Sequence, residues 1–138
     1  MTDIEAIAAS FHHACMTGAG WVACRLHCTP DATFEHEGET FADVRTLEAY
    51  AAFVQNLYAP VPDFRHEVLA VAIDRAIGRA IVHYRIRGTH TGEGLPAPPT
   101  GKAIASNCVL ILHFEGELIH HAQMVWNDRE MMKQVGWI

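Results

Sequence analysis

Residues 102–126 have the sequence KAIASNCVLILHFEGELIHHAQMVW, in which two runs of Val, Ile, Leu and aromatic residues flank Glu115-Gly116. Such residues favour strands, and a glycine supplies the positive φ that a two-residue hairpin turn needs. The pattern predicts strands over Lys102 to Phe114 and Glu117 to Trp126, joined at Glu115-Gly116.

Two more strands are predicted upstream, over Phe64 to Ile73 and Arg79 to Thr91, with turn residues Asp74 to Gly78 between them. A loop rich in Gly and Pro, residues 92–101, leads to the next strand. After residue 126, the spacing of Met131, Met132 and Val135 predicts a short final helix that ends at Gly136. The second half of the chain is therefore a meander of long strands closed by a helix.

The first half has helical periodicity instead. One helix is predicted to end near Thr17-Gly18, with Thr2 and Glu5 at the spacing of a capping box. A second runs from Trp21 to Cys28, where Thr29-Pro30-Asp31 stops it. A short strand is expected within residues 31–41, and a third helix follows from a cap at Asp43 to residue 58.

Helices followed by a strand meander favour an α+β fold. Long consecutive strands twist and curl, so we expect a curved, mostly antiparallel sheet wrapped around the N-terminal helices to form a cone with an internal cavity. The 138 residues suffice for one domain, residues 1–138, with a single core.

The composition argues against several kinds of partner. Lys and Arg total 10 against 16 Asp and Glu, with no basic cluster, so nucleic acid is not expected. No apolar run approaches the ~20 residues that span a bilayer, so no membrane is expected either. The start, Met1 to Glu5, lacks the features of a signal peptide, which predicts a cytoplasmic protein.

Ten histidines invite a functional interpretation, because each can ligate a metal or move a proton. Their spacing contains no HExxH and no zinc-finger pattern. Cys24 and Cys28 lie four apart without a matching second pair, which is typical of two buried thiols. No metal site is expected.

Four segments identify a family resemblance. They are Pro62-Asp63-Phe64-Arg65, Arg87-Gly88-Thr89-His90-Thr91-Gly92, Pro98-Pro99-Thr100-Gly101-Lys102 and Met132-Lys133-Gln134-Val135-Gly136. In order and spacing they resemble the SnoaL-like polyketide cyclases, a branch of the nuclear transport factor 2-like superfamily. The resemblance implies an apolar pocket inside a cone, a homodimer or homotetramer, and no cofactor. Motifs of this kind mostly mark turns and packing, so they identify a fold better than a reaction.

The resemblance also implies a catalytic acid after the last strand, which removes a proton from carbon before an intramolecular aldol condensation. Counting back from Gln134-Val135-Gly136 places Asn127 at that position, and a shift of one residue places Asp128 there. An amide cannot serve as a carboxylate base, so the difference matters. Asp128 in an apolar cone would have its pKa raised by burial. Alternatively, Asn127 or Asp128 caps the last helix.

Alternation along the last strand yields two candidate sets. A pocket that holds Asn127 also holds His121 and Gln123, whereas one that holds Asp128 also holds His120 and Trp126. One of the two histidines is expected to face the cavity as partner of the base. The remaining candidates for substrate binding lie elsewhere in the chain: Asn107, His36, His13 and Tyr58.

The function favoured by these residues is a small cofactor-independent enzyme, a lyase or isomerase, that acts on an apolar carbonyl compound by proton abstraction from carbon. Asp128 is the predicted base, with His121 or His120 as its partner, and the outcome is aldol cyclisation or isomerisation. A non-catalytic ligand-binding or dimerisation domain of the same fold is the alternative. Hydrolytic or dehydrating chemistry in the same cone is a third possibility.

Overall fold

The computed structural model describes residues 3–138 of the chain. Over these residues the helices and strands follow one another in the order α1 (Ile4–Met16), α2 (Trp21–Cys24), the 3-10 turn η1 (Arg25–His27), β1 (Cys28–His36), α3 (Leu47–Leu57), β2 (Arg65–Asp74), β3 (Arg79–Thr89), β4 (Ala103–Glu115), β5 (Leu118–Trp126) and α4 (Asp128–Val135). None of the described helices is long and apolar enough to cross a bilayer.

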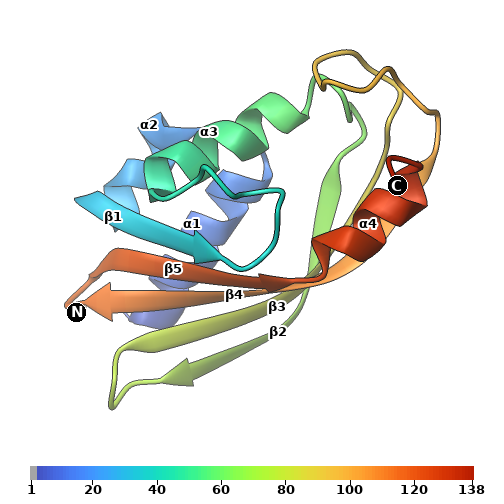
Figure 1. The fold of residues 1–138 in the computed structure, drawn as a ribbon. Helices are drawn as coiled ribbons and strands as arrows, with labels where there is room; N and C mark the ends of the chain where they lie inside the picture. The colour runs from blue at the N-terminus through green and yellow to red at the C-terminus, as the bar shows by residue number, and fades with distance from the viewer. Residues whose placement is uncertain (1–2) are drawn as a thin grey trace.

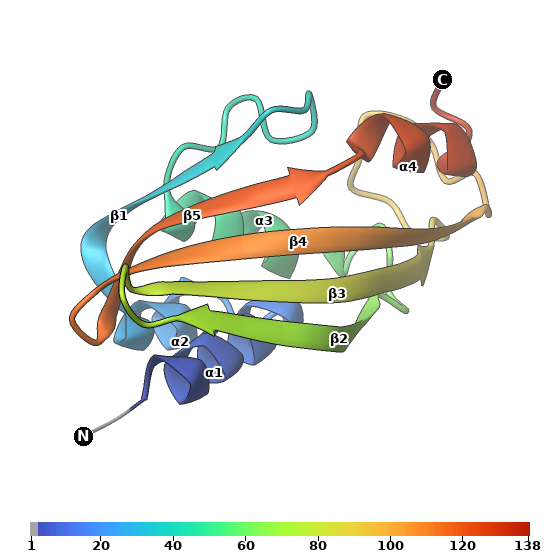
Figure 2. The same cartoon turned by 90° about the horizontal axis from the view of Figure 1, so that it is seen from below.

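The strands form one curved sheet in the order β1-β5-β4-β3-β2, as Figure 2 shows. Strands β2 to β5 are the predicted antiparallel meander, and β1 pairs parallel with β5. The sheet is therefore mixed, with one parallel pair at its edge, and the predicted α+β fold is confirmed. The turn between β4 and β5 is Gly116-Glu117, one residue later than predicted, with Gly116 at a φ of 61°.

The sequence-based boundaries around β1 were wrong. The predicted second helix stops at Cys24, and the strand begins at Cys28 and includes Pro30. Proline removes a backbone donor, but β1 lies at the sheet edge, and its register with β5 shifts between Cys28 and Thr33. The missing N–H of Pro30 is tolerated there because an edge strand with an irregular register needs fewer ladder hydrogen bonds.

The caps of the long helices also differ from the prediction. The side chain of Asp3 accepts a hydrogen bond from the Glu5 amide at the start of α1, whereas Thr2 lies outside the described residues. Helix α3 is capped by Thr46 and not by Asp43, since Thr46 bridges to Thr33 of β1 and is held in an extended conformation. A residue fixed in a β-bridge cannot belong to a helix, which delays the start of α3.

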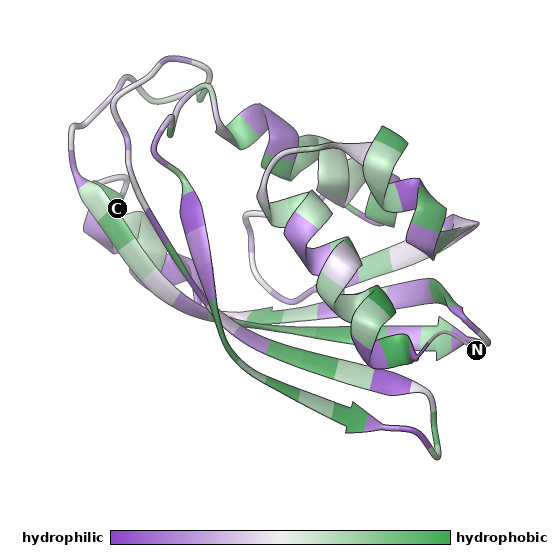
Figure 3. Cartoon of the chain, turned by 180° about the vertical axis from the view of Figure 1, so that it is seen from behind, coloured by the Kyte–Doolittle hydropathy of each residue, from purple (hydrophilic) through white to green (hydrophobic). Residues whose placement is uncertain are grey.

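Helices α1, α2 and α3 cover one face of the sheet, as Figure 1 shows. Apolar residues recur along the strands and on the helices above them (Figure 3). In β3, alternate residues such as Val82, Tyr84 and Ile86 are buried against the helices, as the sequence predicted. The opposite face of the sheet is partly exposed and includes Ile81 and Val125.

Helix α4 lies apart from the other helices, at the end of the sheet where the loop between β3 and β4 lies (Figure 1). Asn127 caps its start by accepting a hydrogen bond from the Glu130 amide, and Gly136 ends it in the left-handed conformation with a φ of 84°. The helix packs against β4. Together α3, α4 and the curved sheet enclose a cavity.

Candidate functional site

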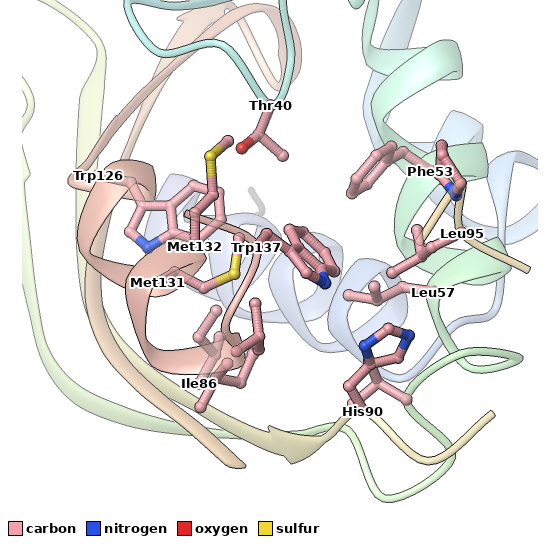
Figure 4. A pocket seen from close by; sticks show the side chains of 14 residues that line it. Thr40, Phe53, Leu57, Ile86, His90, Leu95, Trp126, Met131, Met132 and Trp137 are labelled. Atoms are coloured by element: carbon pink, nitrogen blue, oxygen red, sulfur yellow. The ribbon is translucent and has the colours of Figure 1, made fainter. Parts of the chain in front are cut away.

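The cavity between α3, α4 and the sheet has a volume of about 280 Å³ and an almost entirely apolar wall (Figure 4). Its size suits a small organic molecule. The residues that line it come from α3, β3, β4, β5, α4 and the loops: Thr40, Phe53, Leu57, Val61, Ile86, His90, Leu95, Pro96, Ile104, Trp126, Met131, Met132, Val135 and Trp137. These described lining residues include no Asp, Glu, Lys or Arg, so the cavity favours an uncharged occupant.

Asp128, the predicted base, is the first residue of α4 and is only 7% exposed. Its Oδ2 accepts two hydrogen bonds from Thr40, one from the backbone N–H and one from the hydroxyl, each 2.8 Å long. Burial raises the pKa of Asp128, but the Thr40 hydrogen bonds and nearby His36 outweigh it, and the net pKa is below its usual value. The sequence-based expectation of a raised pKa was therefore wrong, because polar partners compensate for the burial.

His36, at the end of β1, lies beside this carboxylate with its Nε2 3.9 Å from Asp128 Oδ2. Its Nδ1 donates to the Met124 carbonyl at 3.0 Å, which fixes the orientation of the ring. In the neutral ring this leaves Nε2 as a buried acceptor, and Nε2 has no hydrogen-bond partner. Gly38 passes so close to both side chains that a Cβ there would collide with them.

Thr40 connects the Asp128 carboxylate to the cavity. Its side chain lines the cavity while its hydroxyl donates to Asp128 (Figure 4). Asp128 itself lines a smaller crevice on the other side, and Met132 belongs to the walls of both spaces. Thr40 and Met132 therefore form the partition between the buried carboxylate and the apolar cavity.

His90 is a cavity residue that the sequence-based site did not include. Its side chain is 1% exposed, lines the cavity, and has no hydrogen-bond partner at either ring nitrogen. Trp137, also absent from the predicted set, lines the same cavity with an unpaired indole N–H. The signal for His90 was its position in Arg87-Gly88-Thr89-His90-Thr91-Gly92, two residues beyond Gly88 on the inward side of the strand.

The two histidines predicted as partners of the base lie on the outer face of the sheet. His121 is hydrogen-bonded to Thr33 at 2.7 Å and donates to Glu35 at 3.1 Å, and its ring is 4.9 Å from that of His113. His120 is 6.3 Å from the same His113 ring. His121 faces outward because it alternates with the buried Ala122 and Met124, and His120 is the extra residue of a register shift between β4 and β5. His36 is the histidine that accompanies Asp128.

The other predicted binding residues are dispersed. Trp126 lines the cavity and donates from its indole N–H to Ser106 at 2.7 Å. Asn127 is the helix cap and Asn107 is exposed on the outer face. Gln123 lines a separate pocket with His36, outside the main cavity. Of the residues predicted from the sequence, Trp126 therefore lines the cavity, and Asp128 and His36 lie together behind the partition.

Two candidates from the first half of the chain also lie outside the cavity. Tyr58 donates its hydroxyl hydrogen bond to the Met16 carbonyl at 2.6 Å. His13 is exposed on α1, and its neighbour His12 is the buried one, 4.4 Å between ring centroids from Tyr84. Tyr58 thus links the end of α3 to the end of α1, whereas His13 is exposed.

Metal-ligating side chains do not converge within residues 3–138, where no group of three or more His, Cys, Asp or Glu is placed to hold an ion. The four cysteines are buried free thiols, and the Cys28 thiol donates to the Cys24 carbonyl. The spacing of Cys24 and Cys28 thus reflects packing, as the sequence indicated.

The curved sheet, the covering helices and the apolar cavity between them define a cone of the nuclear transport factor 2-like class. IdmH, a candidate polyketide cyclase from Streptomyces antibioticus, superimposes with a TM-score of 0.77 at 20% identity, over 98% of this chain and 99% of its own. AclR, a candidate hydroxylase from Streptomyces galilaeus, has a TM-score of 0.77 at 19% identity, over 98% and 96%. An NTF2-like protein of unknown function from Burkholderia pseudomallei has a TM-score of 0.74 at 13% identity, over 99% of both chains.

The sequence model of the SnoaL-like polyketide cyclases matches residues 6–135. The chain belongs to this family, as its motifs indicated. No curated protein matches the sequence.

Proposed function

We propose that this protein is a cofactor-independent enzyme that binds a small, uncharged, apolar carbonyl compound in the cavity and removes a proton from the carbon next to the carbonyl. Cyclisation by intramolecular aldol addition, or isomerisation, would follow. The observation that carries the proposal is the buried Asp128 carboxylate at the partition beside an apolar cavity, with His36 next to it.

The wall of the cavity supports the class of substrate. An apolar lining without charged side chains favours a neutral molecule, since a charge buried there without a partner would be costly. The apolar wall also strengthens any hydrogen bond to an oxygen that becomes negative during the reaction. Membership of the polyketide cyclase family agrees with a multiply oxygenated carbon skeleton.

Asp128 is the base in this proposal, because its lowered pKa keeps it ionised at neutral pH. A carboxylate is a weak base, so the substrate carbon must already be acidified by flanking carbonyls. General base catalysis contributes roughly 10²–10⁴ in rate. Direct access requires Met132 to move from the partition, and a methionine has the rotatable bonds for such a change.

The proton balance of an aldol cyclisation closes within the site. The C–H electron pair becomes an enolate as the proton passes to Asp128. The enolate carbon then attacks a second carbonyl of the same molecule, and the new alkoxide takes the proton back. The lowered pKa of Asp128, to which nearby His36 contributes, favours return of that proton to the alkoxide.

A non-catalytic ligand-binding domain is the second candidate. It is favoured by the two hydrogen bonds from Thr40, which hold Asp128 as a structural link between α4 and the loop of residues 37–40. In that case Asp128 would matter for stability and not for chemistry. The two candidates predict different behaviour of Asp128→Asn.

We also propose that the protein is a homodimer in which the outer face of the sheet is covered by a second copy. Val125 and Ile81 are exposed there, and Val109 and Ile111 between them are only partly covered. Apolar side chains grouped on one face favour an interface.

The test of the enzymatic proposal is proton exchange at carbon, which needs no knowledge of the natural substrate. 2-Tetralone is a neutral bicyclic ketone whose C1 is acidified by both the carbonyl and the fused aromatic ring. It is incubated with protein in D₂O, and loss of the C1 proton signal is followed by NMR. The wild-type protein should accelerate exchange, and Asp128→Asn should reduce the acceleration by roughly 10²-fold or more.

The control is Glu130→Gln, which makes the same change of charge two residues along the same helix, at an exposed side chain. It should exchange protons at the wild-type rate. If 2-tetralone binds by calorimetry but Asp128→Asn exchanges as fast as the wild-type protein, the carboxylate is not the base. The ligand-binding domain is then the better account.

A further inference from the structure

We propose that His90 and Trp137 form a polar binding site inside the cavity, apart from Thr40, for an uncharged oxygen of the ligand. The inference rests on the proposed function only in taking the cavity as the place where the ligand binds. It assigns His90 and Trp137 a role in positioning and selecting the ligand. A substrate would then place its acidic carbon toward Thr40 and an oxygen near these two side chains.

The backbone fixes His90 with its ring toward the cavity. Its N–H donates to the Lys102 carbonyl at 3.0 Å, and its own carbonyl accepts from Gly101 at 2.8 Å, which continues the pairing of β3 with β4. Just before it, Thr89 donates to Asp63 from both its N–H and its hydroxyl. Because residues alternate along an extended chain, His90 points inward like Ile86 and Gly88.

Glycines at both sides of His90 let this segment lie against the turn after α3. A Cβ at Gly88 would collide with Val61, and one at Gly92 would collide with the Ala59 carbonyl. Gly92 also donates its N–H to the Pro60 carbonyl at 2.9 Å. The motif that carries the family resemblance therefore packs the strand end tightly and holds the imidazole in place.

The polar atoms of this site are buried and unpaired. Both ring nitrogens of His90 and the indole Nε1 of Trp137 have no hydrogen-bond partner. The two rings meet edge to face with centroids 5.6 Å apart. Such a ring contact orients the side chains but is weaker than a hydrogen bond, and buried donors in proteins are normally paired.

The donors determine the chemistry of the partner. Trp137 offers one N–H, and a neutral imidazole offers one donor and one acceptor. A carbonyl oxygen can accept from both side chains, and a hydroxyl can accept from Trp137 and donate to His90. A carboxylate is disfavoured because the described lining has no cation. The oxygen is thus an uncharged carbonyl or hydroxyl.

The location separates this site from the proposed base. Figure 4 shows Thr40 and His90 at opposite sides of the cavity, with Trp137 in between. Trp126, on the wall near α4, already donates its N–H to Ser106. Thr40 already donates its hydroxyl to Asp128. Among the described lining side chains, His90 and Trp137 therefore hold the N–H donors still open to a ligand.

The experiment compares two probes of the same shape, 2-naphthol and 2-methylnaphthalene, by isothermal titration calorimetry. The ratio of their dissociation constants is measured for the wild-type protein, Trp137→Phe and His90→Phe. Each variant should lower the preference for 2-naphthol by about tenfold, because each removes one partner of the oxygen. Trp126→Phe removes a cavity N–H that is already paired, and it should leave the ratio unchanged within about twofold.

A second readout uses the wild-type protein, and a variant is needed only to assign the NMR signals. Of the three tryptophan indole N–H signals in an ¹H–¹⁵N spectrum, only that of Trp137 should move downfield with 2-naphthol and not with 2-methylnaphthalene. A ratio unchanged within about twofold in both His90→Phe and Trp137→Phe would overturn the inference. So would a crystal of the 2-naphthol complex with a water molecule alone between the two side chains.

These results are independent of turnover. Asp128→Asn should keep the wild-type ratio of dissociation constants, since Asp128 is not part of this site. Absence of proton exchange with the naphthol preference intact would refute the proposed function and leave this inference standing. Proton exchange together with an unaltered ratio in both His90→Phe and Trp137→Phe would refute this inference and leave the proposed function standing.

Discussion

Removal of the Asp128 carboxylate should destabilise the protein by about 3 kcal/mol. The carboxylate is 7% exposed and accepts two 2.8 Å hydrogen bonds from Thr40. A hydrogen bond to a charged group contributes about 1.5–3 kcal/mol, and two bonds that share one oxygen are worth less than twice that. In Asp128→Ala the Thr40 N–H also loses its partner, which places the loss near the upper end of that range.

The assay is urea unfolding at pH 7, followed by circular dichroism, for the wild-type protein, Asp128→Ala, Asp128→Asn and Glu130→Gln. Asp128→Asn keeps an acceptor oxygen and should lose about half as much as Asp128→Ala. Glu130→Gln should stay within about 0.5 kcal/mol of the wild-type protein. If the free energy of unfolding of Asp128→Ala also lies within about 0.5 kcal/mol of the wild-type value, the hydrogen bonds between Asp128 and Thr40 do not stabilise the protein in solution. The predicted loss would then be refuted.

Three further predictions concern other parts of the molecule. Burial, with His66 nearby, lowers the pKa of His12 to about 3, so between pH 7 and pH 5 only the unfolded state takes up a proton there, at the ordinary histidine pKa of 6.5. The free energy of unfolding should therefore fall by about 2 kcal/mol between pH 7 and pH 5. Urea unfolding of His12→Leu should lack that part of the pH dependence. Gly92→Ala forces a methyl group against the Ala59 carbonyl and should cost about 1–3 kcal/mol in the same assay, whereas a wild-type midpoint would contradict the close approach. Val125→Arg should convert the proposed homodimer into a 15.3 kDa monomer in light scattering, and a wild-type protein already monomeric would refute the dimer.

Much of the fold could be predicted because its signals are local. Strands β2 to β5 lie within one or two residues of the predicted ranges, since alternating apolar residues and glycine turns depend on near neighbours in the chain. Errors arose where a distant segment intervened. Pro30 is in a strand because β5 pairs with only part of β1, and α3 starts late because Thr46 bridges to Thr33.

The site was predicted only in part, for the same reason. Asp128 and Trp126 follow from their place at the end of the last strand. The partner of Asp128 is His36, which is 92 positions away in the numbering and meets it through the pairing of β1 with β5. His121 and His120 were nearer in sequence, but alternation along β5 turns His121 to the outer face and a register shift turns His120 there.

Family membership, the order of helices and strands, and the net charge of −6 follow from the amino-acid sequence, because composition and periodicity are properties of the chain alone. The tertiary structure decided which polar groups share a space. It set the pKa of Asp128 through Thr40, and it left His90 and Trp137 unpaired within an apolar wall. Hydrogen bonds and burial depend on neighbours brought together from distant segments, and for that reason the chemistry of this cavity is a property of the folded cone.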